Sequence, residues 1–278
     1  MTERKNIWDI LSNKELDIQQ EYENLWALIE NGNTVSKNGY YSYSVLDILR
    51  ENFIDFESRN TFITIDSFLD YLELNRVRYG IQTIDKLDLF IEIIILMFQE
   101  LKALNFSNVF RYKYNYSDIR HSIMKNIDLI LEKSNQRIVE IEPNKKIVVP
   151  NDEVVTVVSD IILPDNERLA LSILSYSHYR NKDNIEGKAN ILTNLHKYLE
   201  QKQGKIKDKN IEYVFNNFML RHGLKKNKQR VDMLGTKKVN ALYDALFEEI
   251  LYFMLEKEHA DFNLQINEIK KEVGDAGK

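Results

Sequence analysis

The chain has 278 residues, of which 44% are hydrophobic, 29% charged and 11% aromatic, and its formal net charge is −5. This composition can bury a large core, and the length fits one large domain or two ordinary ones. The chain contains no cysteine, which excludes disulfides, thiolate metal ligands and a cysteine nucleophile. Nine glycines and three prolines are few for a protein rich in tight turns, so we expect a mainly α protein.

The amino-terminal stretch MTERKNIWDILSNKELD is charged from its first residues and lacks the apolar core of a signal peptide. The most apolar stretch begins at Leu87 and is interrupted by Glu92, Gln99 and Glu100. It is too short and too polar to span a bilayer, so we interpret it as a core helix. These features favour a cytoplasmic protein that does not associate with membranes.

The first third of the chain is dominated by helical patterns. Apolar residues recur at three- and four-residue spacings, which predicts helices over 16–29, 44–56, 67–78 and 84–104. The polar, glycine-containing link 31–42 has the composition of a loop. We expect these helices to form one bundle.

The pattern changes in the middle of the chain. One more helix is predicted over 117–133, and the β-branched runs RIVEIE and KIVVP predict a small β-hairpin near residues 137–149. A short helix is predicted over 152–162, and Pro164 marks a break. We place a domain boundary there, with an amino-terminal helical region of residues 1–163 that contains the hairpin.

Residues 164–278 follow a simpler pattern. Four helices are predicted, over 166–180, 185–202, 211–222 and 236–258, and the segment 223–235 is predicted to be a loop. Short connections favour antiparallel neighbours, so we expect a four-helix bundle.

Positive charge is concentrated in one segment of this second region. Between Lys202 and Lys238 there are 11 Lys or Arg and 3 Asp or Glu, a charge of +8, which leaves −13 on the rest of the chain. A charged run is usually a solvated surface, but a phosphate-binding surface is the alternative. The candidate RNA-binding residues are Lys225, Lys226, Lys228 and Arg230. The aromatic run FRYKYNY at 110–116 is a secondary candidate, although such aromatics usually pack in the interior.

The stretch NNFMLRHG at 216–223 allows two interpretations. Cationic side chains followed by a glycine are typical of a helix terminus, which Arg221, His222 and Gly223 would provide. Alternatively, His222 falls in the apolar stripe of the predicted helix, and Asn217 and Arg221 lie one turn apart beside it. The second interpretation predicts a polar site.

Three segments resemble a family of uncharacterised bacterial proteins and, through it, the HEPN-like abortive-infection group. They are YSHYRNKDNIEGKANILTNLHKYLE, VFNNFMLRHG and a terminal helix ending in YFMLE, and the resemblance covers about residues 113–258. The resemblance implies that the chain forms a dimeric helical bundle that binds RNA. It also implies that the chain is a metal-independent endoribonuclease acting in anti-phage defence. It further implies a partner protein encoded nearby.

The hallmark of that superfamily is an arginine followed four to six residues later by a histidine. Here Arg221 and His222 are adjacent, and Asn217 stands five residues before the histidine. RNA can be cleaved by its own 2′-hydroxyl, so the enzyme need supply only proton transfer and positive charge. The implied catalytic roles are proton transfer for His222, phosphate contact for Arg221, and an amide contact to phosphate or imidazole for Asn217.

Other chemistries find little support in the sequence. There is no HExxH motif, no calcium loop and no phosphate-binding glycine loop, so we expect no metal and no cofactor. His178 either lines the same groove as His222 or has a structural, hydrogen-bonded role, and we interpret His196 as peripheral packing.

The rival hypothesis is a non-enzymatic sensor or scaffold that uses the bundle to dimerise or to bind a partner protein. The apolar pattern of the last helix favours a homodimer. Its apolar residues include Leu242, Leu246, Ile250, Phe253 and Met254.

Overall fold

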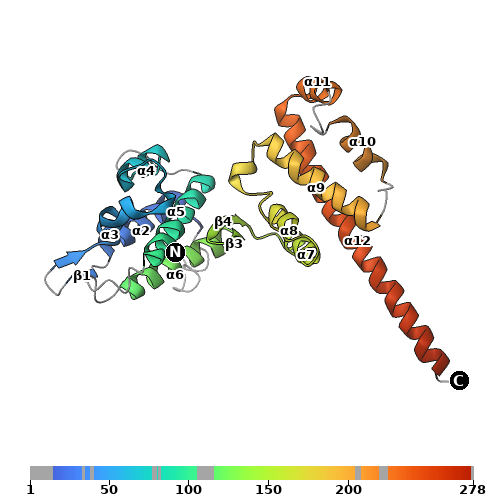
Figure 1. Ribbon diagram of the computed structural model, residues 1–278, viewed down its shortest axis with the longest axis horizontal. Helices are drawn as coiled ribbons and strands as arrows, with labels where there is room; N and C mark the ends of the chain where they lie inside the picture. Colours follow the sequence, from blue (N-terminus) through green and yellow to red (C-terminus); the bar gives the residue numbers. More distant parts are fainter. Residues whose placement is uncertain are drawn as a thin grey trace, which may run out of the picture. The chain divides into compact units, whose positions relative to one another are not determined.

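The structure, a computed structural model, describes residues 15–32, 35–37, 41–76, 80, 83–104, 116–203, 208–218 and 225–276. Helices predominate and are accompanied by two small antiparallel sheets (Figure 1), which confirms the expected mainly α fold with a small hairpin. The chain divides into two compact units, Met1–Pro150 and Asn151–Lys278. The structure therefore places the division before the short helix predicted at 152–162, because that helix packs with those that follow it.

The first unit contains the predicted helices with shifted ends. Its elements are α2 (Ile18–Ala27), which continues as a π-helical turn (Leu28–Gly32), β1 (Val35–Lys37), β2 (Tyr41–Tyr43), α3 (Val45–Asn52), 3-10 turns at Phe53–Asp55 and Glu57–Arg59, α4 (Ile65–Tyr71), α5 (Ile84–Ala103), α6 (Tyr116–Lys133), β3 (Gln136–Glu142) and β4 (Lys145–Pro150). The link 31–42 was expected to be a loop, but it contributes β1 and most of β2, with Val35 paired to Tyr43.

Helix α5 forms the centre of the first unit. Phe90 on this helix packs against Tyr22 and Trp26 of α2, with ring centroids 4.9 and 5.4 Å apart. The hairpin β3–β4 is fixed to the same helix, because the backbone N–H of Val148 donates to Glu92 Oε1 at 2.7 Å. Long apolar helices and β-branched strands thus share one core.

The second unit is built from helices alone among its described residues. They are α7 (Glu153–Ile162), α8 (Glu167–Leu174), a 3-10 turn (Tyr179–Asn181), α9 (Ile185–Gln203), α10 (Lys209–Asn217), α11 (Lys225–Leu234) and α12 (Thr236–Ala276). In the region 164–278, where four helices were expected, the described residues form five α-helices, α8 to α12. The predicted helix 166–180 ends at Leu174, and the predicted helix 211–222 ends at Asn217. The last helix continues past 258 to Ala276.

The segment expected to be a loop, 223–235, contains helix α11. Lysine, glutamine, arginine and leucine are good helix formers. Val231 is buried and Leu234 is partly buried against the core, which anchors the otherwise charged helix. Gly235 has φ of +83° and ends α11, and its N–H donates to the Val231 carbonyl at 3.0 Å. The prediction of a loop was wrong because two apolar residues suffice to dock this helix.

Among the described helices, none is both long enough and apolar enough to cross a membrane.

Candidate functional site

Helix α10 is held in place at both ends. At its start, Asp208 Oδ1 accepts from the backbone N–H groups of Asn210 and Ile211, at 2.8 and 2.9 Å. At its end, the buried Tyr243 of α12 donates its hydroxyl to the Phe218 carbonyl at 2.7 Å. The predicted site residue Asn217 therefore occupies the last turn of a short helix that is tied to α12.

Two of the predicted site residues meet in the structure. Asn217 Nδ2 donates to the Tyr213 carbonyl at 2.7 Å, and Asn217 Oδ1 accepts a hydrogen bond from Arg230 Nη1. Arg230 is exposed on α11. The end of α10 and the basic helix are thus joined by a hydrogen bond between side chains that lie 13 positions apart in the sequence.

The other predicted residues have different outcomes. The backbone of Lys225, Lys226 and Lys228 forms the first turn of α11, so these residues belong to one helix with Arg230. Arg221 and His222 lie outside the described residues. Their proposed catalytic roles stay predictions.

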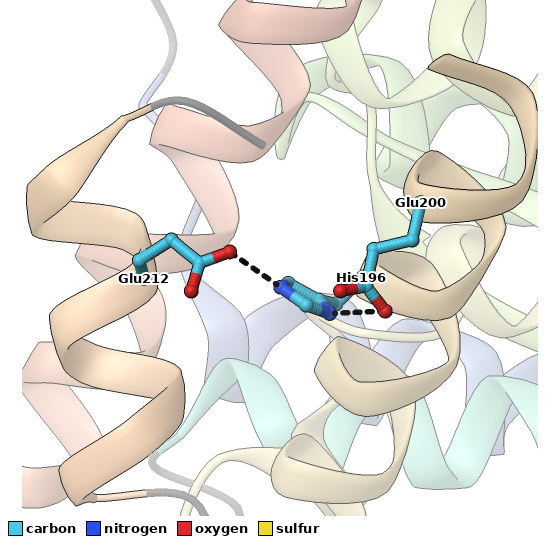
Figure 2. A group of neighbouring side chains, drawn as sticks. All are labelled: His196, Glu200 and Glu212. Carbon is cyan, nitrogen blue, oxygen red and sulfur yellow. Dashed lines mark ion pairs between the residues drawn. The ribbon is translucent and has the colours of Figure 1, made fainter. Parts of the chain in front are cut away.

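A histidine that the sequence analysis assigned to peripheral packing lies instead between two carboxylates (Figure 2). The side chain of His196 on α9 is only 3% exposed. Its Nδ1 lies 3.4 Å from Glu200 Oε2, and its Nε2 lies 3.9 Å from Glu212 Oε1 of α10. The ring also packs on Phe215, with centroids 4.0 Å apart. The spacing of His196 and Glu200 was visible in the sequence, but the contact with Glu212 depends on the packing of two helices.

His178 has a structural role in the described part of the chain. It is buried, its Nδ1 accepts from the backbone N–H of Arg180 at 3.3 Å, and its ring lies 4.1 Å from that of Tyr179. It therefore caps the 3-10 turn between α8 and α9.

A buried lysine joins α9 to α12. Lys188 Nζ donates to Asp244 Oδ1 at 2.7 Å, to Asn240 Oδ1 at 2.8 Å and to the Lys182 carbonyl at 3.2 Å. It also lies 5.5 Å from the centre of the Tyr176 ring. An ammonium group has three donors, and all three are used here, so Lys188 is a structural cation.

Comparison with known proteins adds no assignment. No protein-family model matches the chain, and neither a curated protein nor a solved structure matches it.

Proposed function

We propose that the carboxy-terminal unit binds RNA where α10 meets α11, through Arg230, Lys225, Lys226 and Lys228. The observation that carries this proposal is the hydrogen bond from Arg230 to Asn217, which gives one cation of the basic helix a defined position. An arginine held on one side keeps further N–H donors for a two-pronged contact with phosphate. The concentration of +8 within residues 202–238 supports the same surface.

Asn217 has a more specific role in this proposal than direct contact with phosphate. Both ends of its amide group are engaged, by the Tyr213 carbonyl and by Arg230. Asn217 is therefore a positioning residue for Arg230. Replacing Asn217 should therefore weaken RNA binding by no more than the loss of Arg230 itself would.

We extend the proposal to a metal-independent endoribonuclease of the HEPN-like kind that acts in bacterial anti-phage defence. In the proposed reaction, His222 accepts the proton of the 2′-hydroxyl as its oxygen attacks phosphorus. The bond to the 5′-oxygen breaks, a cyclic phosphate forms, and the leaving oxygen takes up a proton. Arg221 would stabilise the charge that develops on the phosphate oxygens.

Binding is tested with a fluorescent single-stranded RNA titrated at several salt concentrations. The affinity should fall steeply with salt, and replacing Lys225, Lys226 and Lys228 with Gln should lower the log–log slope by about 0.7 for each lost phosphate contact. A matched control removes the same amount of positive charge elsewhere in the unit. In this variant three exposed residues are replaced with Gln: Arg168, Lys197 and Lys270. Equal losses in the two triple variants would contradict the assignment of α11.

Cleavage is tested separately with total RNA and excess chelator. Arg221→Lys and His222→Ala should abolish cleavage while thermal melting stays close to that of the wild type, because a lysine cannot reproduce the planar contact. Cleavage that persists in both variants would show that this stretch only ends a helix.

A second function, self-association, is favoured by the far part of α12. Figure 1 shows this part extending past the other helices of its unit. Most of the apolar residues that were expected to form the dimer interface pack in the core of their own unit instead, since Leu246, Ile250 and Met254 are buried there. On the same helix, Tyr252, Phe262 and Ile269 are 55%, 57% and 53% exposed.

These exposed side chains belong to a regular stripe. Positions at alternating spacings of three and four are Tyr252, Leu255, His259, Phe262, Ile266, Ile269 and Val273. Such a stripe requires a helix of the same period, and a second copy of α12 provides one. Over about three heptads, two copies would remove on the order of 1,000 Å² from water, the size at which specific interfaces begin.

Light scattering at micromolar concentration tests the dimer. We expect twice the chain mass of 33.0 kDa. Phe262→Glu combined with Ile269→Glu should restore the single-chain mass, whereas Leu264→Glu should not, because Leu264 is 61% exposed but lies off the stripe. A wild-type mass near that of one chain would refute self-association.

A further inference from the structure

His196, Glu200 and Glu212 form a cluster of metal-ligand type between α9 and α10 (Figure 2). One ligand atom from each residue can be chosen so that the three atoms lie within 4.8 Å of one another. The imidazole is buried, whereas the side chains of Glu200 and Glu212 are 41% and 23% exposed. The cluster is thus buried at its imidazole, whereas each glutamate side chain is in part accessible to solvent.

Neighbouring residues position each member of this cluster. His196 and Glu200 are one turn apart on α9, and the ring of His196 packs on Phe215. Glu212 Oε2 accepts from Asn216 Nδ2 at 3.3 Å, which directs the other oxygen inward. That oxygen, Glu212 Oε1, is buried and receives no hydrogen bond from the residues that the structure describes.

We propose that this cluster binds a divalent transition-metal ion of the Zn²⁺ class and thereby fixes α10 to α9. Zinc bonds to histidine nitrogen and carboxylate oxygen are 2.0–2.2 Å long, so the three ligand atoms would have to move closer together. The two partly exposed glutamates can do so by rotating. The two ring nitrogens of His196 face different carboxylates. The ion therefore binds only one of the two nitrogens, together with the two glutamates, and water completes its coordination.

Charge and ligand type indicate which ion fits. Two carboxylates beside one imidazole carry a net negative charge even when the imidazole is protonated, and a divalent cation offsets it. Mg²⁺ and Ca²⁺ prefer sets of oxygen ligands, whereas imidazole suits Zn²⁺ and its neighbours in the first transition row. The ion also competes with protons for the imidazole, so binding should weaken in acid.

The test uses the full chain, stripped with a chelator and dialysed. Zn²⁺ binding is measured by calorimetry, and thermal melting by circular dichroism reports the stabilisation that a ligand of the folded state provides. We expect one Zn²⁺ per chain and a higher melting temperature. Mg²⁺ at the same concentration should produce neither effect.

Three variants and one control complete the test. Glu200→Gln and Glu212→Gln should each weaken Zn²⁺ binding by about tenfold or more, and His196→Gln should abolish it. Glu256→Gln, an exposed residue of α12, should bind as the wild type does. If His196→Gln fails to fold, the two glutamate variants still decide. Absence of Zn²⁺ binding, or equal binding by Glu212→Gln and the wild type, would show that the cluster is only an ion-paired histidine.

Discussion

Replacing Asp88 with Asn should stabilise the amino-terminal unit, and more strongly at pH 8 than at pH 5. Asp88 on α5 is 4% exposed, and its Oδ2 accepts from Gln136 Nε2 at 2.7 Å. Its Oδ1 receives no hydrogen bond from the described residues. Burial raises the pKa of Asp88 from 3.8 to about 7, and the nearby Glu92 and Asp85 carboxylates add to the rise, against the opposing effect of the Gln136 hydrogen bond.

The sign and size of the effect follow from the pKa. A carboxyl whose pKa is raised by folding contributes its full stability below about pH 4, and this contribution is lost as the pH rises through about 7. Each unit of pKa is worth about 1.4 kcal/mol. At pH 5 the folded carboxyl is protonated and the unfolded one is ionised, so the raised pKa lowers stability by about 1.7 kcal/mol, and at pH 8 the buried charge lowers it by about 4.3 kcal/mol. Asparagine keeps an acceptor for the Gln136 hydrogen bond, but its amide group is also buried at a cost. This cost reduces the gain in the free energy of unfolding at every pH. The difference between the two pH values, about 2.5 kcal/mol, does not depend on that cost.

Urea unfolding followed by tryptophan fluorescence measures this difference. Both tryptophans of the chain, Trp8 and Trp26, belong to the amino-terminal unit, so the fluorescence reports on that unit. Asp128→Asn is the matched control, because Asp128 is exposed on α6 and its replacement should change stability little at either pH. An equal gain for Asp88→Asn at pH 5 and pH 8 would refute the reasoning.

Three further substitutions test the packing of the second unit by thermal and urea unfolding monitored by circular dichroism. Gly187→Ala should fail to give the gain of about 1 kcal/mol usual for a helix, because the new Cβ would lie 2.5 Å from Asn184 Nδ2. Part of the gain should reappear in an Asn184→Ala background, where only the 3.1 Å contact with Asn181 Oδ1 remains. Lys188→Met should cost about 2 kcal/mol, since it removes the buried cation that joins α9 to α12, and a cost under about 0.5 kcal/mol would contradict the structural role. Tyr243→Phe should cost about 1–2 kcal/mol through the lost bond to the Phe218 carbonyl, and an unchanged stability would show that this bond contributes nothing.

The elements predicted best from sequence are those whose stability is largely local. Helix α5 was expected over 84–104 and spans Ile84–Ala103, because a long apolar run fixes a core helix. The hairpin expected near 137–149 forms as β3 and β4, because β-branched residues flank a short turn. The spacing of apolar residues and the residue types of a turn each determine structure over a few positions. Both can therefore be read from a single sequence.

Two features that were missed, the end of α10 and the cluster around His196, depend on contacts between segments that are distant in the sequence. Helix α10 ends at Asn217, and the Phe218 carbonyl that follows is bound by Tyr243, 25 positions away. The partner of His196 on α10, Glu212, is likewise distant in sequence and shares no local pattern with it. A motif search finds ligands that are close in the chain, so it could not find a cluster assembled by two helices.

The proposed RNA-binding surface and the proposed metal site of the second unit meet at α10, which yields a last prediction. A helix of nine residues is marginal alone, so its position is set by its contacts. Glu212 in its first turn faces the proposed metal site, and Asn217 in its last turn positions Arg230. An ion that fixes α10 should therefore tighten RNA binding several-fold, and RNA must tighten Zn²⁺ binding by the same factor. Glu212→Gln should remove the effect of Zn²⁺ and leave metal-free RNA binding unchanged. Equal RNA affinity with and without bound Zn²⁺ would show that the core contacts and Tyr243 already fix α10.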